Sequence, residues 1–498
     1  MSETKKLNLY FTSDVHGYFY PTTYGDDTVK QMGLFGCVGG FRKDEDTLVI
    51  DGGDILQGSA FAGYCRQNQR TPRTLGEIMS DCGYDYFTLG NHDFNYGQEY
   101  LRAYVRANRG RCVCQNVTDE AGNVLYPYDI RVMQSGLRIG IAGVVTDYVN
   151  IWEKKENLEG ICVTDPFAAA KEALDRLKGE TDVTILSYHG GFERDLASGR
   201  VLSATTENVG YRICEELDYD IVLTGHQHTS IDGQYLCGTY VVQPSENARE
   251  YHYLELTWAD GKNNIRSKKK KADLSCAIGR KLCKKYQPIE DEVQRWLDQP
   301  IGHLSRELRP REKAQMALYG SPIADFLNTI QIYFSGAQIS AVSLANEIMG
   351  FGRDVSMRDI IATYPYPNSL VVCKITGRQL RTVMERSAEY FDVDADGTVR
   401  VAKSFLEPKV EHYNYDYYMG VTYEIDPLQP QGSRIRNLSY EGNPVGDNDC
   451  FTMCVNNYRY SGAGGYPVYP ECELISEIGT EMVDLIVEYF HQNPHVTI

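Results

Sequence analysis

The N-terminal stretch Leu7-Asn-Leu-Tyr-Phe-Thr-Ser-Asp14-Val-His16-Gly17 joins a short apolar strand directly to a polar cluster. The same order, a strand and then polar residues, recurs four more times in the first half of the chain. The clusters are Asp14-Val-His16-Gly17, Gly53-Asp54, Gly90-Asn91-His92-Asp93, His189-Gly190 and Gly225-His226-Gln227-His228. Loops that follow the carboxyl ends of strands meet at one edge of an open α/β sheet. We therefore expect the five clusters to form a single site.

Strand and helix periodicities alternate along the first half of the chain. Strands are predicted at residues 7–12, 48–50, 84–89, 137–145, 183–187 and 221–223. Helices are predicted at residues 75–82, 98–107, 167–177 and 205–217. This alternation predicts an α/β fold whose sheet is covered on both faces. The run 251–258 is predicted to form an edge strand of this layer.

The second half lacks the strict alternation and is predicted to be a separate α+β domain. Its predicted strands are 370–375, 417–425 and 451–455, and its predicted helices are 322–334, 378–391 and 473–490. A helical run stops at Pro300 and another starts at Pro322, so we expect the boundary near residues 300–320. The predicted domains are residues 1–305 and 306–498. The basic run 266–271 before this boundary is interpreted as a solvated strand end or loop.

The overall composition limits the class of protein. The chain of 498 residues is 42% hydrophobic and 24% charged, which excludes collagen, low-complexity disorder and small disulfide scaffolds. It has 50 basic and 68 acidic residues, a net charge of −18, so we expect no nucleic-acid polymer as partner. No uncharged apolar run approaches the ~18 residues of a membrane span, so no membrane partner is expected. Without a visible leader segment we expect a cytoplasmic protein, or an extracellular or periplasmic one if a leader preceded this sequence.

Seven side chains of the clusters have the donor types of a transition-metal site. Carboxylate, amide and imidazole donors together suit Mn, Fe, Zn or Co better than Mg or Ca. Seven donors are too many for one ion and fit two divalent metal ions that share a bridging carboxylate. The expected assignment is Asp54 as the bridge, with Asp14, His16 and His228 on one ion and Asn91, His189 and His226 on the other.

Charge and position suggest what such a site does. Two divalent cations with two carboxylates leave the site positive inside an acidic protein, which favours a phosphate group as substrate. Such ions lower the pKa of a bound water toward ~7 and hold the attacking and leaving oxygens of an in-line displacement. His92 is not expected to bind a metal ion, so it is free to donate a proton to the leaving oxygen. Asp93 beside it is expected to orient the imidazole.

Each cluster alone also has an ordinary explanation. Asp-x-His after a strand is commonly local capping, and Gly, Asn and Asp all favour turns. However, five of the ten histidines fall in these clusters, each next to a predicted strand end, which chance explains poorly. The remaining histidines are interpreted as structural or surface residues: His252, His303, His412, His491 and His495.

The five clusters, in this order, resemble the signature of the calcineurin-like metallophosphoesterases: Asp-x-His, Gly-Asp, Gly-Asn-His-Asp/Glu, His and Gly-His-x-His. This resemblance covers about residues 7–260 and implies a four-layer α/β/β/α domain. Segments 359–372 and 456–466 are similar to the C-terminal nucleotide-binding domain of the 5′-nucleotidase family. That family implies two aromatic rings that hold the nucleobase between them, and they would fall on Tyr366 and Tyr458.

Segments 53–58, 91–97 and 412–416 look like the 2′,3′-cyclic-nucleotide 2′-phosphodiesterase/3′-nucleotidase branch of this family. The Gly-Gly-x-Arg motif of the 5′-nucleotidase branch is missing around residues 340–352, and Gly464 replaces its ribose-binding aspartate. The resemblance thus implies an enzyme of nucleotide catabolism that hydrolyses 2′,3′-cyclic nucleotides and 3′-nucleotides with a metal-bridging hydroxide. The alternatives are a 5′-nucleotidase or nucleotide-sugar hydrolase, a protein phosphatase, and a nucleotide-binding sensor that has lost catalysis.

Overall fold

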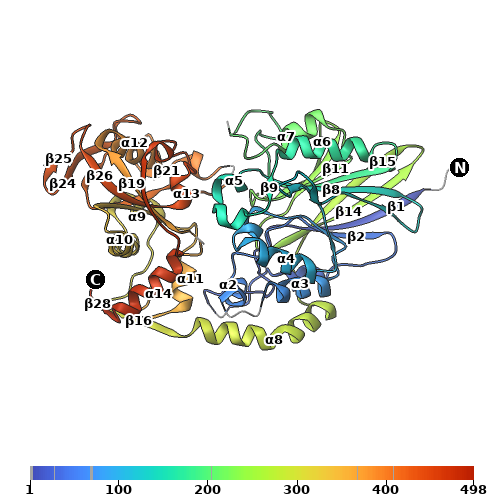
Figure 1. The fold of residues 1–498 in the computed structure, drawn as a ribbon, viewed down its shortest axis with the longest axis horizontal. Coiled ribbons are helices and arrows are strands. Elements are labelled where there is room, and N and C mark those ends of the chain that lie inside the picture. Colours follow the sequence, from blue (N-terminus) through green and yellow to red (C-terminus); the bar gives the residue numbers. More distant parts are fainter. Residues whose placement is uncertain (1–3, 27, 68–70, 203–204, 367, 408) are drawn as a thin grey trace. The chain divides into compact units, whose positions relative to one another are not determined.

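The computed structural model describes residues 4–26, 28–67, 71–202, 205–366, 368–407 and 409–498. Met1–Glu3 lie outside these ranges, and so does Pro367, which belongs to the motif 359–372. The contacts divide the chain into two compact units, Met1–Val293 and Gln294–Ile498 (Figure 1). The boundary expected between residues 305 and 306 stays a prediction.

Two six-stranded sheets form the centre of the first unit. The order of the first sheet is β15 (Lys262–Lys271), β14 (Glu250–Ala259), β1 (Lys5–Thr12), β2 (Thr47–Asp51), β3 (Tyr86–Phe87) and β4 (Arg111–Cys112). The order of the second sheet is β12 (Ile231–Leu236), β13 (Thr239–Gln243), β11 (Ile221–Thr224), β10 (Val183–His189), β8 (Arg138–Val145) and β7 (Asp129–Val132). Most strands therefore come from the predicted apolar runs.

The two sheets pack face to face through one apolar layer. Leu9 and Phe11 of β1 share a buried cluster with Ile141, Ile185 and Leu223 of the second sheet. Side chains alternate between the faces of a strand, so the residues between these in β1 lie on the other face of the sheet. Each fully buried side chain of this kind contributes about 1.5–3 kcal/mol, which makes this layer the main stabilising contact between the sheets.

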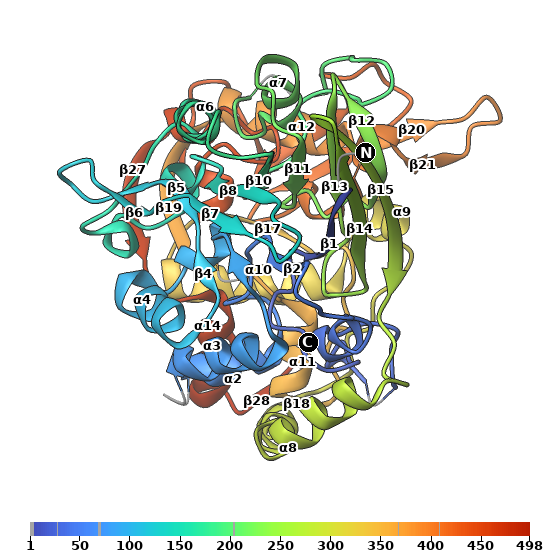
Figure 2. The same cartoon turned by 90° about the vertical axis from the view of Figure 1, so that its right-hand side faces the viewer.

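Helices cover the outer face of each sheet. Helices α6 (Pro166–Leu177) and α7 (Gly210–Glu216) pack on the second sheet, where Leu174 shares a buried cluster with Leu186 of β10. On the other side lie α2 (Ala60–Gln67), α3 (Thr71–Cys82) and α4 (Gly97–Ala107) (Figures 1 and 2). There Tyr104 of α4 meets Phe87 of β3, with ring centroids 5.5 Å apart. The expected four-layer α/β/β/α architecture is confirmed.

The expected position of one strand in the first sheet is wrong. The run 251–258 was predicted as an edge strand, but β14 pairs with β1 on one side and with β15 on the other. The edge strand is β15, which ends in the run Lys268–Lys271. The charge of this run is the reason for its interpretation as a strand end or loop. Lysines on an exposed edge strand discourage pairing with another chain, so the basic composition suits the edge and hides the strand from sequence analysis.

The second unit has a five-stranded sheet with buried clusters on both faces. Its order is β22 (Asp416–Met419), β17 (Ile339–Ser343), β26 (Cys450–Asn456), β19 (Leu370–Thr376) and β27 (Glu473–Ile478). Helices α10 (Pro322–Ser335) and α14 (Met482–Gln492) pack on one face, and α12 (Gly377–Ala388) packs on the other. Pro322 occupies the first turn of α10, as the sequence predicts, and the Ser321 side chain caps the helix by accepting the backbone N–H of Ala324.

Two predicted elements of this unit are wrong. The expected helix 473–490 is the edge strand β27 followed by α14, because the chain breaks at Gly479 and β27 pairs with β19. The expected strand 417–425 is split at Gly420 into β22 and β23 (Thr422–Ile425). Gly420 has φ +94°, and a Cβ there would lie 2.2 Å from the carbonyl oxygen of Gln338. Only glycine fits this turn.

Helix α8 (Ala277–Leu297) contains the boundary between the two units. Its lysines and Arg280 face solvent on a helix whose buried side chains include Leu282 and Tyr286. None of the helices in the described part of the chain is both long and apolar enough to cross a membrane.

Candidate metal centre

The strands that carry the five clusters run parallel within each sheet. Strands β1, β2 and β3 are parallel neighbours in the first sheet, and β10 and β11 are parallel neighbours in the second. Asp14 follows β1, Asp54 follows β2, Asn91 follows β3, His189 ends β10 and His226 follows β11. Parallel strands end at the same edge, so the polar loops of both sheets meet there.

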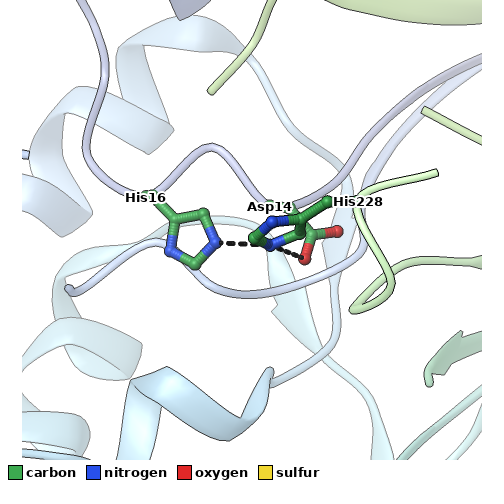
Figure 3. Close-up of side chains that lie close together, drawn as sticks. All are labelled: Asp14, His16 and His228. Carbon is green, nitrogen blue, oxygen red and sulfur yellow. Dashed lines mark hydrogen bonds and ion pairs between the residues drawn. The ribbon is translucent and has the colours of Figure 1, made fainter. Parts of the chain in front are cut away.

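The first group of donors consists of Asp14, His16 and His228 (Figure 3). The Nε2 atoms of His16 and His228 lie 3.1 Å apart, and His228 Nε2 lies 3.4 Å from Asp14 Oδ1. All three ligand atoms are within 4.8 Å of one another. Asp14 and His16 are buried, whereas the His228 side chain is 30% exposed and opens the group to solvent.

Asp54 lies between this group and a second one. Its Oδ2 atom is 3.2 Å from His189 Nε2 and 3.8 Å from His16 Nε2. This buried oxygen accepts no hydrogen bond from any residue that the structure describes, whereas its Oδ1 accepts the backbone N–H of His92. A buried carboxylate oxygen without a donor is costly unless a cation balances it. The position therefore fits a carboxylate shared by two metal ions.

Asn91 and His226 complete the second group. Asn91 Oδ1 lies 2.8 Å from His226 Nδ1 and 3.2 Å from His189 Nε2. Asp14, Asp54 and His189 also offer ligand atoms within 4.8 Å of one another, so Asp14 lies close to both groups. The structure thus brings together all seven residues that the sequence singles out as donors. The assignment of each residue to one of two ions stays a prediction.

Hydrogen bonds to the other ring nitrogen orient the imidazoles. His16 Nδ1 lies 2.9 Å from the Gln57 carbonyl oxygen, and His189 Nδ1 lies 2.7 Å from that of Gly52. A carbonyl only accepts, so Nδ1 carries a hydrogen and Nε2 is the nitrogen that faces the donor group. His226 is reversed: its Nε2 bonds to Glu207 Oε1 at 2.8 Å and its Nδ1 faces Asn91. Such outer partners are typical of metal-binding histidines.

The backbone of these loops is strained. Five of the predicted donors are non-glycine residues with left-handed φ values between 51° and 69°: Asp14, His16, Asp54, His226 and His228. Each such conformation costs on the order of 1–3 kcal/mol and persists only where surrounding contacts enforce it. Gly90 allows the loops to approach closely, because a Cβ there would lie 2.1 Å from Asp54 Oδ1. Strain and close approach therefore coincide at the site.

The charges of the site shift the pKa values of its members. Burial lowers the pKa of His16 to about 4, so its imidazole is neutral at neutral pH. Burial also opposes the charge of His189, but the nearby Asp54 carboxylate outweighs it and raises the His189 pKa to about 10. For Asp54, burial alone would raise the pKa, yet His189 and His92 hold it well below its usual range. Asp54 is thus an anion that attracts cations.

His92 and Asp93 both lie at this centre, but they do not act on each other as expected. The His92 ring is 5.5 Å from that of His16, and its Nδ1 lies 2.8 Å from Asn95 Oδ1. The Asp93 carboxylate instead accepts backbone N–H bonds from four residues: Asp54, Ile55, Leu56 and Gly90. The short turn η1 (Asn91–Phe94) points consecutive side chains in different directions. Asp93 therefore fixes the loop that carries Asp54.

Sequence reasoning missed three residues at this site. Asn95 bonds to His92, Glu207 bonds to His226, and the Trp152 ring stacks on the His226 ring at 5.4 Å. Asn95 belongs to the segment 91–97 that carries the family resemblance, which was a usable signal. Glu207 lies in an irregular segment and Trp152 ends the short helix α5 (Val149–Trp152). Neither residue belongs to a motif, so only the folded chain places them there.

Tyr366 and Tyr458 lie in the second unit and are both half-buried. Burial raises the pKa of the Tyr366 phenol, and the nearby Tyr458 raises it further. The next residue, Arg459, is fully buried and pairs with Asp416 at 2.9 Å, which holds the short helix that carries Tyr458, α13 (Asn457–Tyr460), in place. The Tyr366 ring contacts that of Tyr413, with centroids 6.3 Å apart, and the guanidinium of Arg459 lies 5.9 Å from the centre of the Tyr458 ring.

Comparison with protein families gives one match in each half of the chain. Residues 7–230 match the calcineurin-like phosphoesterases, and residues 300–471 match the 5′-nucleotidase C-terminal domain. A Staphylococcus aureus protein of known structure, provisionally described as a 5′-nucleotidase and solved with alpha-ketoglutarate, is 30% identical with a TM-score of 0.90. The alignment covers 98% of this chain and 97% of that one.

Curated relatives are more distant in sequence. The trifunctional nucleotide phosphoesterase protein YfkN of Bacillus subtilis is 24% identical over 98% of this chain, which spans 38% of that protein's length. The 2′,3′-cyclic-nucleotide 2′-phosphodiesterase/3′-nucleotidase of Haemophilus influenzae is 26% identical over 92% of this chain and 80% of its own. The chain therefore belongs to the calcineurin-like metallophosphoesterases that carry a 5′-nucleotidase C-terminal domain.

Proposed function

We propose that this protein is a dimetal phosphoesterase that hydrolyses 2′,3′-cyclic nucleotides and 3′-nucleotides. The observation that carries the proposal is the arrangement around Asp54, whose buried Oδ2 has no hydrogen-bond donor among the described residues and faces His189 and His16. Imidazole lone pairs and carboxylate oxygens that converge in this way fit Mn, Zn, Fe or Co. The names of the Haemophilus influenzae and Bacillus subtilis relatives support the nucleotide substrate.

The proposed ligands are the seven residues predicted from the sequence: Asp14, His16, Asp54, Asn91, His189, His226 and His228. When bound, two divalent ions supply positive charge for the phosphoryl oxygens and activate the attacking water. Residues of the chain itself would transfer the proton and position the ligand loops. His92, beside His16, is placed to carry a proton to the leaving oxygen, and Asp93 holds the Asp54 loop.

The second unit is proposed to bind the base. Stacking of a nucleobase on an aromatic side chain contributes ~1–3 kcal/mol and tolerates different bases. Tyr366 and Tyr458 are both half-buried, which suits rings that offer one face to a ligand. The same rings would serve nucleotides of any phosphate position, so specificity for the cyclic and 3′ esters belongs to the metal centre.

A substrate panel tests the proposal. The metal-loaded protein is given 2′,3′-cyclic AMP, 3′-AMP, 5′-AMP and a nucleotide sugar, and its metal content is measured. Turnover of the first two substrates well above the others supports the proposal. A preference for 5′-AMP or the nucleotide sugar favours the alternative, a 5′-nucleotidase or nucleotide-sugar hydrolase, which the description of the Staphylococcus aureus protein supports. Binding of nucleotides without turnover would indicate a sensor.

A further inference from the structure

A short segment that follows strand β8 of the second sheet lies against the metal centre. It comprises α5 (Val149–Trp152) and the turn η2 (Lys155–Leu158). Trp152 stacks on the His226 ring, with an interplanar angle of 23°. The next residue, Glu153, contacts the side chain that bonds to His92. One short segment thus contacts both a proposed metal ligand and the proposed proton carrier.

A chain of hydrogen bonds leads from His92 to this segment. His92 Nδ1 lies 2.8 Å from Asn95 Oδ1, and Asn95 Nδ2 donates to Glu153 Oε2 at 2.6 Å. The other carboxylate oxygen of Glu153 accepts from Asn157 Nδ2 and from the backbone N–H of Lys154, both at 2.8 Å. Asn157 Nδ2 also donates to the backbone oxygen of Asn95. All of these side chains are partly buried, so the geometry is held by packing.

The Glu153 carboxylate determines which atom donates and which accepts in each of these hydrogen bonds. An ionised carboxylate only accepts hydrogen bonds, so the amide nitrogen of Asn95 must face Glu153 and its oxygen must face His92. An amide oxygen also only accepts, so Nδ1 of His92 must carry a hydrogen. The other ring nitrogen, Nε2, is then the one that gains and loses the mobile proton.

We propose that Glu153 is a positioning residue that acts through Asn95 to keep the hydrogen on His92 Nδ1 and the mobile proton on Nε2. The inference rests on the proposed function. In the hydrolytic step the oxygen of a water forms the new P–O bond and the P–O bond to the sugar oxygen breaks. The Nε2 proton moves to that sugar oxygen, and the imidazole regains a proton from solvent, which receives the one that the water releases.

The test is Glu153→Gln, which keeps the size of the side chain and removes its obligate acceptor. The introduced amide can present a nitrogen to Asn95, so the Asn95 amide can turn and face His92 Nδ1 with a donor. We expect kcat for 2′,3′-cyclic AMP to fall on the order of 10–100-fold, less than the ~10²–10⁴-fold effect of losing the general acid itself, with unchanged metal content. The matched control is Glu156→Gln, an exposed residue of η2, which should behave as wild type.

The leaving group separates a positioning role from a structural one. p-Nitrophenolate departs without a proton, whereas a sugar oxygen needs one. Glu153→Gln should therefore hardly change the turnover of bis-p-nitrophenyl phosphate, and activity in a series of aryl phosphodiesters should fall more steeply as the leaving phenol becomes less acidic. Equal losses on all substrates, or loss of metal, would show that Glu153 only supports the fold. No loss on cyclic AMP would also overturn the proposal.

A reciprocal double variant, Asn95→Asp with Glu153→Gln, keeps one carboxylate and one amide but exchanges their places. The carboxylate then accepts from His92 Nδ1 and the amide donates to it, so most of the lost turnover should return. If the double variant is as slow as Glu153→Gln with its metals bound, the direction of the hydrogen bonds does not matter and the proposal is wrong.

Nitrogen NMR of the histidines in the zinc-loaded protein gives a readout independent of turnover. We expect His92, assigned through its replacement by asparagine, to carry its hydrogen on Nδ1 in the wild type and to lose this preference in Glu153→Gln. A wild-type protein that hydrolyses aryl esters but no nucleotide would contradict the proposed function only, since the aryl series and NMR still test Glu153. A hydrogen on Nε2 in the wild type would refute the positioning role alone.

Discussion

Replacing Asp54 by asparagine tests the centre of the proposed metal site with a minimal change of shape. The Asp54 side chain is 1% exposed, and its Oδ2 lies 3.2 Å from His189 and 3.8 Å from His16. The substitution removes the charge of a carboxylate that lies between His16 of the first group and His189 of the second. Because both ions would lose a charge, we expect a larger effect than from any other single donor.

The magnitude follows from the distances. At an effective dielectric of ~20, a unit positive charge 3.2 Å from a carboxylate oxygen gains about 5 kcal/mol. Removing one partner from a buried charge pair costs roughly 3–5 kcal/mol. At about 1.4 kcal/mol per factor of ten, metal affinity should fall on the order of 10²–10³-fold, and turnover with it.

The assay measures bound metal and kcat on 2′,3′-cyclic AMP while Mn²⁺ or Zn²⁺ is titrated. Asp51→Asn is the matched control, since Asp51 is a buried carboxyl at the end of β2 and burial raises its pKa to about 8. It is largely uncharged at neutral pH, so its replacement should leave metal binding intact. If Asp54→Asn binds two ions and retains half of the wild-type turnover, Asp54 is not a shared ligand.

Four further predictions concern the other residues of the two units. His92→Asn should keep both metals and lower kcat by ~10²–10⁴-fold, the range for a lost general acid; loss of metal would instead make His92 a ligand. Asp93→Asn should lower the free energy of unfolding by about 1–3 kcal/mol, measured in urea, because the new amide cannot accept all four backbone N–H groups; unchanged stability would contradict this. Replacing Tyr366 and Tyr458 by alanine should remove about 2–6 kcal/mol of nucleotide binding and spare bis-p-nitrophenyl phosphate; equal losses would indicate misfolding. The folded-state pKa of Asp51 is raised to about 8, so the folded state holds a proton that the unfolded chain releases near pH ~3.9, and the stability linked to this proton should decline from there through pH 8. Urea unfolding at pH 6 and pH 9 should then show a flatter pH dependence for Asp51→Asn than for wild type; parallel profiles would contradict the linkage.

Some features of this protein depend on nothing but local sequence. The order of an apolar strand and a polar cluster identifies the donors, because a strand's side-chain alternation and the loop after it are set by neighbouring residues. Parallel strands then place Asp14, Asp54 and Asn91 at one edge of the first sheet without further information. The α/β fold class and the residues that meet at this edge were predictable for this reason, whereas the four-layer arrangement was implied by the family resemblance.

Other elements are decided by contacts between distant residues. The run 473–490 has helical periodicity, but pairing with β19 makes its first part a strand. Likewise the charge of the run 266–271 leaves a strand end and a loop both open, and pairing with β14 decides for the end of strand β15. A short segment of mixed polarity has no strong preference of its own, so tertiary pairing overrides it.

The details of the site belong to this second category. The sequence places Asp93 beside His92, yet the turn at Asn91 directs its carboxylate to backbone N–H groups of another loop. Asn95 is the residue that bonds to the His92 ring instead, and its own partner Glu153 comes from the segment that follows β8. Side-chain direction depends on the φ and ψ angles of each loop residue, and the left-handed values here are enforced only by the assembled sheets. The sequence alone thus determined which seven donors meet, and the tertiary structure decided which other residues join them and which atoms face one another.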